Sequence, residues 1–248
     1  MTGLRRRGAV GVALLLAGLE ALGRASGGTL PPAGDILARA AALALEPGYL
    51  SHLAGTLLTW AGGTLLATAL AIPAGLLLGS LPGVERASRA VLEFLRPMPG
   101  VALFPLVGMM LGSGGTTRVV VVTYVALWPV LFNAVYGLRD VEPVAVDTLR
   151  AFGFGRTAVM VRVSLPSAAP FIATGVRLAA GIALIATIAG EIFMGTGQGI
   201  GVHVAQSTFV PDATVEVLAV TVWAALLGLL ANTLLVRGER RLLPWTHR

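Results

Sequence analysis

Residues 147–170 read DTLRAFGFGRTAVMVRVSLPSAAP and lie between two long apolar segments of the chain. The stretch carries three arginines and an isolated glycine, with a leucine-proline pair near its end. It is too basic to cross a bilayer, because a spanning helix needs about 20 mainly apolar residues. It is also too short to bury its apolar side chains in a core of its own. Another surface must therefore cover them.

Two short helices are predicted on either side of Gly153. Pro143 occupies a favoured first helical position, and Gly153 a favoured position just past a helix end. Asp147 and Arg150 are three residues apart and are expected to pair across one helical turn. A second short helix is expected to follow the glycine and to end at Pro166, because proline lacks the N–H that continues a helix.

The composition of the whole chain indicates a membrane protein. Of its 248 residues, 56% are hydrophobic and only 12% are charged, and the mean hydropathy is +0.84. Soluble proteins contain roughly 25% charged residues. Several segments reach the length of a spanning helix, about 20 residues, without a single charge. We therefore predict an all-α, polytopic membrane protein.

The sequence predicts one transmembrane domain over residues 1–248, with about six spanning helices. Two of its segments carry additional signals. The first apolar segment has the basic start of a signal peptide, so its retention in the mature protein stays open. The third segment is rich in proline and glycine, which lipid tolerates only where a helix packs against protein or a cavity. The expected spans are 8–25, 53–79, 97–117 and 119–138, with the last two spans within 171–236.

Three segments between the spans are expected to lie at the membrane surfaces. Residues 26–50 are expected to form an external linker with a short amphipathic helix at the membrane surface. Residues 139–170 are expected to form a cytoplasmic loop, and residues 195–212 a glycine-rich outer loop.

The arginines fix the predicted orientation. With the N-terminus inside, fourteen arginines fall on the cytoplasmic side and three outside, as the positive-inside rule requires. Both termini and the opening stretch are then cytoplasmic. The inner set comprises Arg5, Arg6, Arg7, Arg86, Arg89, Arg96, Arg139, Arg150, Arg156, Arg162, Arg237, Arg240, Arg241 and Arg248, and the outer set Arg24, Arg39 and Arg118.

Several kinds of chemistry are excluded by residue usage. All eighteen basic residues are arginine, and a P-loop needs a lysine on the nucleotide phosphates, so any ATP that the protein uses must bind a separate subunit. The chain has no cysteine, which excludes disulfides and thiolate metal sites. The basic residues are scattered between spans rather than gathered on one domain, which argues against nucleic acid as a partner.

An intramembrane enzyme is also disfavoured. Serine protease chemistry in a membrane needs a serine and a histidine within reach of each other. His52 and His203 fall in predicted outer loops and His247 in the tail, and no H-E-x-x-H motif occurs. A secondary transporter or channel is the alternative transport function, since charged residues inside spans also suit it.

The spacing in the opening stretch resembles the EAA loop of binding-protein-dependent ABC importer permeases. That family's pattern is E-A-A-x3-G-x9-I-x-L-P, and here the stretch reads D-T-L-x3-G-x9-V-x-L-P. Gly153, Leu165 and Pro166 match, Val163 replaces isoleucine, and Asp147 replaces the glutamate. Threonine and leucine stand where the family has two alanines. A helix lying on the inner leaflet is the other interpretation of the stretch.

The resemblance extends along nearly the whole chain and is closest to the nitrate/sulfonate/taurine branch of that family. It is carried by LPPAGDILARA, LRPMPGVALFPLVGMML, NAVYGLRDVEP, LPSAAPFIATGVRLAAGIAL and GIGVHV. It implies a type I ABC importer permease fold in a bacterial inner membrane. It also implies a role in transmitting ATPase movement for Asp147, Arg150, Phe152, Gly153, Val163, Leu165 and Pro166.

The resemblance also implies the partners. These are an ATPase subunit that binds ATP and Mg²⁺, a second copy of the permease, an extracytoplasmic solute-binding protein and membrane lipid, with no cofactor on this chain. The implied solutes are nitrate, an alkanesulfonate or taurine, with thiamine-precursor pyrimidines as an alternative.

Two charges lie inside the penultimate predicted span. Arg177 and Glu191 are fourteen residues apart, which places them about 21 Å apart along a helix. They cannot pair with each other, so each needs another partner or a water-filled cavity. The resemblance favours a role in the pathway or its gating. Alternatively, both side chains reach out to the bilayer boundaries.

Overall fold

The computed structural model describes residues 2–209 and 212–247, together with their side chains except at 2–9, 82, 246 and 247. Met1 and Arg248, the ends of the predicted domain, lie outside the described residues, as do Val210 and Pro211 of the expected outer loop. The side chains of Arg5, Arg6 and Arg7, which belong to the predicted inner set, are likewise not described. Every element in the described part of the chain is a helix.

Five long helices run through the molecule, and shorter ones connect them. The long helices are α1 (Thr2–Ala25), α3 (Pro47–Ser80), α6 (Gly115–Arg139), α9 (Leu165–Met194) and α11 (Ala213–Leu242). The shorter ones are α2 (Ala33–Leu43), α4 (Pro82–Leu95), η1 (Gly100–Ala102), α5 (Leu103–Leu111), α7 (Pro143–Ala151), α8 (Arg156–Val159), a π-helical segment (Met160–Ser164), α10 (Ile200–Ser207) and η3 (Pro244–His247).

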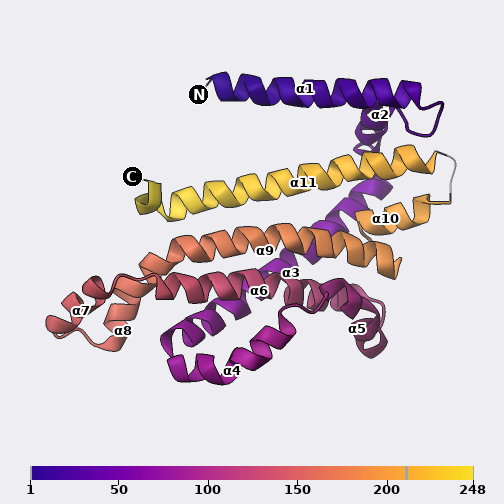
Figure 1. Ribbon diagram of the computed structural model, residues 1–248. Helices are drawn as coiled ribbons and strands as arrows, with labels where there is room; N and C mark the ends of the chain where they lie inside the picture. Colours follow the sequence, from indigo (N-terminus) through magenta and orange to yellow (C-terminus); the bar gives the residue numbers. More distant parts are fainter. Residues whose placement is uncertain (1, 210–211, 248) are drawn as a thin grey trace.

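In Figure 1 α6, α9 and α11 run roughly parallel, α3 crosses them obliquely, α1 lies apart and contacts α2, and the connections gather at the two ends of the bundle. The pair α7 and α8 projects from one end, which is also the end where α1 begins and α11 finishes. The helices α5 and α10 lie at the opposite end. The arginine distribution predicts that the α7–α8 end faces the cytoplasm, and on that prediction we call it the cytoplasmic end. We call the other end the outer end.

Four helices are long and apolar enough to cross a membrane, and a bent pair adds a fifth candidate. The four are Pro47–Ser80, Gly115–Arg139, Arg156–Met194 and Ala213–Leu242. The bent pair joins Gly83–Leu95 to Gly100–Leu111 at an angle of 73°. The span expected at 97–117 is therefore wrong in its bounds, because the helical part of this segment belongs to the bent pair. Its two prolines, Pro97 and Pro99, cannot donate the N–H groups that a continuous helix requires, so the chain breaks there.

Small residues allow the three central helices to approach closely. A Cβ atom at Gly75 on α3 would lie 2.5 Å from the Cβ of Ala134 on α6. A Cβ at Gly175 on α9 would lie 2.7 Å from the Cβ of Asn133. Buried alanines such as Ala126 continue this contact. Close packing through small residues is how membrane helices associate, because burial of apolar surface adds little in lipid.

The helix expected in the external linker is present as α2, but its apolar side is not left on the membrane surface. Ile36, Ala40 and Leu43 are buried, and α2 packs against α11. The indole N–H of Trp223 on α11 donates to the carbonyl of Ala40 at 2.9 Å. The amphipathic pattern predicted the helix, but it could not predict that another part of the chain covers its apolar side.

Candidate functional site

The first candidate site is the helical hairpin at the cytoplasmic end, formed by α7, the turn after it and α8. Helix α7 begins at Pro143, as predicted. Gly153 has φ = +83°, the Gly153 N–H donates to the carbonyl of Arg150 at 2.9 Å, and the Phe154 N–H donates to the carbonyl of Leu149 at 3.1 Å. These two bonds form a Schellman motif, whose left-handed residue is best supplied by glycine. The predicted conformation at Gly153 is confirmed.

The tip of this hairpin exposes apolar side chains. Phe152 is 79% exposed and Val144 67%, and α7 has no buried residue among those described. Asp147 and Arg150 form the expected ion pair, 3.6 Å long and largely exposed. A surface pair of this kind contributes under about 1 kcal/mol, so it orients the helix face more than it stabilises it.

A cation–π contact holds the turn that follows. The guanidinium carbon of Arg162 lies 4.9 Å from the centre of the Phe154 ring. Such a contact contributes roughly 0.5–1 kcal/mol at an exposed site. It joins the turn to the π-helical segment that carries Arg162. The tip is therefore held both by the Gly153 turn and by this contact. Sequence analysis missed this contact, although eight residues separate the two and both lie in the family-like stretch.

Pro166 does not end the second helix, contrary to the prediction. Residues 156–194 form one continuous helix, because a π-helical segment, Met160–Ser164, precedes the proline. The N–H of Leu165 donates to the carbonyl of Met160, one residue further back than in an α-helix. A π-turn absorbs a residue and changes the register, which accommodates the missing N–H of Pro166. Val163 therefore lies in the π-helical segment that runs directly into α9, and Leu165 and Pro166 are the first residues of α9.

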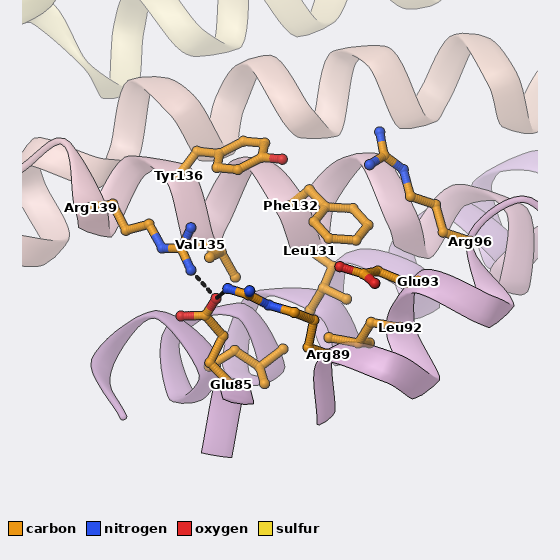
Figure 2. Close-up of a pocket in the computed structure, with 11 residues that line it drawn as sticks. Glu85, Arg89, Leu92, Glu93, Arg96, Leu131, Phe132, Val135, Tyr136 and Arg139 are labelled. Atoms are coloured by element: carbon orange, nitrogen blue, oxygen red, sulfur yellow. Dashed lines mark hydrogen bonds and ion pairs between the residues drawn. The ribbon is translucent and has the colours of Figure 1, made fainter. Parts of the chain in front are cut away.

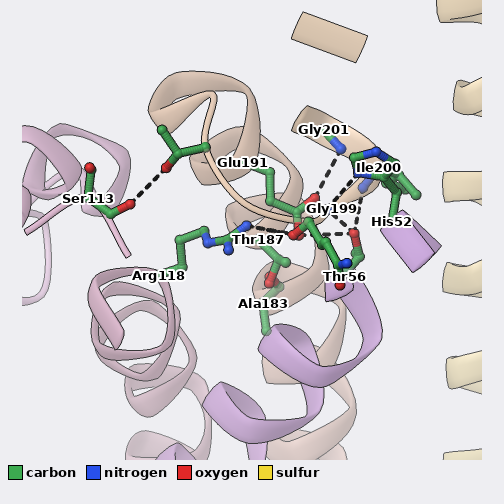
Figure 3. Close-up of polar contacts among 12 residues, drawn as sticks. His52, Thr56, Ser113, Arg118, Ala183, Thr187, Glu191, Gly199, Ile200 and Gly201 are labelled. Atoms are coloured by element: carbon green, nitrogen blue, oxygen red, sulfur yellow. Dashed lines mark hydrogen bonds and ion pairs between the residues drawn. The ribbon is translucent and has the colours of Figure 1, made fainter. Parts of the chain in front are cut away.

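The second candidate site surrounds Glu191 at the outer end of α9. Its side chain is fully buried, and its two carboxylate oxygens lie 2.8 and 2.9 Å from the hydroxyl oxygen of Thr56 on α3. The N–H of Gly201 donates to Glu191 Oε2 at 3.0 Å. Figure 3 shows these groups converging on the carboxylate from three elements. A buried carboxylate of this kind persists only because donors surround it.

The chain segment that caps this carboxylate is bonded through its backbone. The Ile200 N–H donates to the Thr56 hydroxyl at 2.8 Å, and the Gly199 N–H donates to His52 Nδ1 at 3.1 Å. A Cβ at Gly199 would overlap the Glu191 carboxylate, so glycine is required there for space. The expected glycine-rich loop thus contains a short helix, α10, and is fixed to α3 and α9.

Arg118 completes what we call the outer polar cluster: Thr56, Arg118, Glu191, Gly199 and Gly201. Arg118 Nη1 donates to the carbonyl of Gln198 at 2.9 Å and lies 4.0 Å from Glu191 Oε1. Only 9% of its side chain is exposed, so it is not the solvated outer charge that the arginine count assumed. Nor does Glu191 reach out to the bilayer boundary. That alternative is wrong, because donors from α3 and α10 enclose the carboxylate.

Arg177 has a partner of a different kind. Its Nη1 atom lies 3.7 Å from Glu239 Oε2 on α11, and the Arg177 side chain is 36% exposed. The ion pair joins α9 to α11 in the half of the bundle that leads to the cytoplasmic end. Arg177 and Glu191, grouped as pathway candidates, are therefore not brought together. A charge inside a span signalled each of them, but no sequence signal identified Glu239 or Thr56 as their partners.

Comparisons with known proteins agree with this architecture. Residues 71–244 match the family described as "Binding-protein-dependent transport system inner membrane component". The taurine transport system permease protein TauC of Escherichia coli is 30% identical over 221 residues, which cover 87% of this chain and 80% of TauC. The nitrate import permease protein NrtB of Leptolyngbya laminosa is 26% identical, with coverage of 80% of this chain and 71% of NrtB.

A solved structure shares the fold. The MetNI methionine ABC transporter, in an inward-facing conformation, matches with a TM-score of 0.67 and 20% sequence identity. The match covers 79% of this chain and 98% of that chain. It confirms the predicted type I importer fold. Taken together, the family match and the similarity to TauC show that this chain belongs to the inner-membrane permeases of binding-protein-dependent ABC importers.

Proposed function

We propose that this chain forms, with a second copy of itself, the solute pathway of an ATP-driven importer in a bacterial inner membrane. A separate ATPase subunit binds ATP and Mg²⁺, and an extracytoplasmic binding protein delivers the solute. The family supports this division of tasks, and so does the absence of lysine from the sequence, because a P-loop cannot be built without one. In this proposal residues 1–248 act as a single transmembrane domain with both termini in the cytoplasm.

The hairpin is proposed as the element that contacts the ATPase. The observation that carries this is the exposure of Phe152, at 79%, on a tip that the Gly153 turn holds in place. A large exposed aromatic side chain on an ordered tip is typical of an interface residue, which a partner pocket covers. Val144 adds a second exposed apolar side chain on the same short helix.

The continuous helix gives this contact a mechanical consequence. Because residues 156–194 are unbroken, a tilt imposed at the hairpin moves the outer end of α9, where Glu191 binds the capping segment. Nucleotide-driven movement at one end is thereby linked to the outer polar cluster at the other. A secondary transporter or channel has no such need for an apolar cytoplasmic tip.

Copurification tests the contact. The permease is expressed with its partner ATPase, and the bound ATPase is quantified for Phe152→Glu and for Thr157→Glu. Both positions are exposed on the hairpin, and both variants add the same charge. We expect Phe152→Glu to lose most of the bound ATPase and Thr157→Glu to retain it. Equal retention by both variants contradicts the proposal.

The proposed solutes are small compounds that carry an oxyanion group: nitrate, an alkanesulfonate or taurine. The names of TauC and NrtB support this choice. Thiamine-precursor pyrimidines are the alternative. Mass spectrometry of the ligand retained by the copurified binding protein decides between them, since that protein selects the solute.

A further inference from the structure

The strongest feature that these roles leave unexplained is a cavity system beside the break between α4 and α5. Two cavities, of about 210 and 390 Å³, share Arg96, Phe132 and Tyr136 in their walls. The larger one also reaches Met98 and Gly100 in the break itself. Irregular backbone at membrane depth is tolerated where it lines a cavity. The cavity therefore accounts for the break between α4 and α5 at this place.

Arg96 differs from the other arginines of this cavity. Arg139 and Arg89 both bind the carboxylate of Glu85. Arg96 forms no ion pair within the part of the chain that the structure describes, although Glu93 lies in the same wall. Figure 2 shows Arg96 apart from the Glu85 group. Its guanidinium carbon instead lies 4.6 Å from the centre of the Phe132 ring.

The cavity wall beside Arg96 is an aromatic row on one face of α6. Its members are four residues apart, and adjacent rings lie 5.6, 6.3 and 6.2 Å apart from centre to centre. The Tyr124 hydroxyl at one end donates to the Leu95 carbonyl at 2.6 Å, and this carbonyl also accepts the Met98 N–H at the break. The buried indole N–H of Trp128 has no acceptor among the described residues. The row comprises Tyr124, Trp128, Phe132 and Tyr136.

Arg96 lies beside α6, one of the helices long and apolar enough to cross a membrane, and away from both ends of that helix. Phe132, over which it lies, is seventeen residues from Gly115 and seven from Arg139, the ends of α6. At 1.5 Å per residue these separations are about 25 and 10 Å. A cation without a carboxylate partner at such a depth marks an ion or substrate pathway in membrane proteins.

We propose that Arg96 and the aromatic row bind the transported solute during its passage, and that this solute is an organic anion with an apolar body, of the alkyl- or arylsulfonate class. This inference rests on the proposed importer function. A sulfonate presents oxygens that a guanidinium binds through two parallel hydrogen bonds. Its apolar body lies against the aromatic row. Nitrate has no such body, and taurine adds an ammonium group that the guanidinium repels.

The absence of native cysteine provides the test. Ile182 lines the larger cavity and is 41% exposed. The variant Ile182→Cys is purified with the partner ATPase, and its reaction with N-ethylmaleimide is timed without nucleotide in benzenesulfonate, nitrate or taurine. We expect benzenesulfonate to slow the reaction, and nitrate and taurine at the same concentration to have little effect.

Substitutions at Arg96 assign the effect to this residue. In Arg96→Gln the benzenesulfonate concentration that gives half protection should rise by about tenfold or more, because a charge-assisted bond is lost. For Arg96→Lys the half-protecting concentration should lie between those of the parent and Arg96→Gln. For Arg86→Gln, on α4 outside the cavity wall, it should equal that of the parent. An unchanged labelling rate without anion shows that each variant keeps its cavity.

Three results overturn the proposal. If benzenesulfonate protects Arg96→Gln as well as it protects the parent, Arg96 is not part of the binding site. If nitrate protects as well as benzenesulfonate does, the site does not recognise an apolar body on the solute. A thiol that is unreactive without any anion shows that the second copy fills the cavity. Since labelling is measured without nucleotide, a failure of coupling to the ATPase does not affect it, and the two proposals fail separately.

Discussion

The hydroxyl of Thr56 joins Glu191 to the backbone of Ile200. It lies 2.8 Å from Glu191 Oε2 and accepts the Ile200 N–H at 2.8 Å. One side chain on α3 therefore holds both the end of α9 and the start of α10. All three elements meet at the outer end, where an importer must stay closed until its binding protein delivers a solute.

Replacing Thr56 with valine tests this connection with almost no change in shape. The variant leaves the Glu191 carboxylate without this donor and the Ile200 N–H without its acceptor, which costs about 1–3 kcal/mol for each buried group. Hydrogen exchange at Ile200 and Gly201 should become at least about tenfold faster. The control is Thr68→Val, since the Thr68 hydroxyl bonds only a carbonyl of its own helix. Unchanged exchange in Thr56→Val contradicts the connection.

Gly199→Ala tests whether the outer polar cluster has room for a larger side chain. An added Cβ meets the Glu191 carboxylate, and buried overpacking costs about 1–3 kcal/mol. The thermal unfolding midpoint of the purified permease should therefore fall. Gly181→Ala is the matched control, because no atom lies within 4 Å of its added Cβ and alanine favours a helix interior by about 1 kcal/mol. If the midpoint falls equally in both variants, steric overlap with Glu191 is not the cause of the loss of stability.

The ion pair between Arg177 and Glu239 predicts a transport defect without a folding defect. Arg177→Leu should change the free energy of unfolding by under about 1 kcal/mol, since the ion pair is 3.7 Å long and the arginine is only partly buried. It should slow uptake, because α9 and α11 lose a charged contact in the inner half. The exchange Arg177→Glu with Glu239→Arg should recover part of the rate. If Arg177→Leu takes up solute at the parental rate, the alternative holds, in which the Arg177 side chain only reaches out to the bilayer boundary.

Thiol labelling tests the orientation taken from the arginines. Thr157 lies on the hairpin and Thr208 near the end of α10, and both are exposed. In intact inverted and right-side-out vesicles, Thr208→Cys should react with a membrane-impermeant maleimide from the periplasmic side and Thr157→Cys from the cytoplasmic side. The reverse pattern places the hairpin outside and excludes contact with a cytoplasmic ATPase.

Local signals in the sequence were sufficient for α7 and its two ends. Pro143 and Gly153 act on their own neighbours, so the boundaries of α7 followed from them. The charge pair at Asp147 and Arg150 followed in the same way. Pro166 misled, because its effect depends on the register of the preceding turn, and the π-helical segment that accommodates it has no equally simple pattern.

Non-local partners could not be predicted from the sequence. Thr56 lies 135 residues from Glu191, and a threonine in an apolar span carries no signal of such a bond. Arg118 resembled a solvated loop residue, because only the packed chain shows that the segment before α10, at Gly197 and Gln198, lies against it. Arg96 was counted among the cytoplasmic arginines. Its depth became apparent only when the break at Pro97 and Pro99 placed it beside Phe132.

Coupling at the hairpin is the central claim, and Gly153→Arg tests it most directly. In the single chain no atom lies within 4 Å of an added Cβ, so the folded permease has room for the side chain. Its left-handed backbone, with φ = +83°, adds a strain of about 1 kcal/mol or more. Gly27→Arg is the control for this strain, since Gly27 has φ = +62° and open space around it.

The measurement is ATP hydrolysis stimulated by loaded binding protein, followed together with solute uptake in vesicles that contain the whole complex. The account predicts that Gly153→Arg loses stimulation, uptake or both, while Gly27→Arg and Arg156→Ala keep them. If Gly153→Arg hydrolyses ATP and imports solute at the parental rates, the hairpin does not transmit the ATPase movement and instead lies on the inner leaflet.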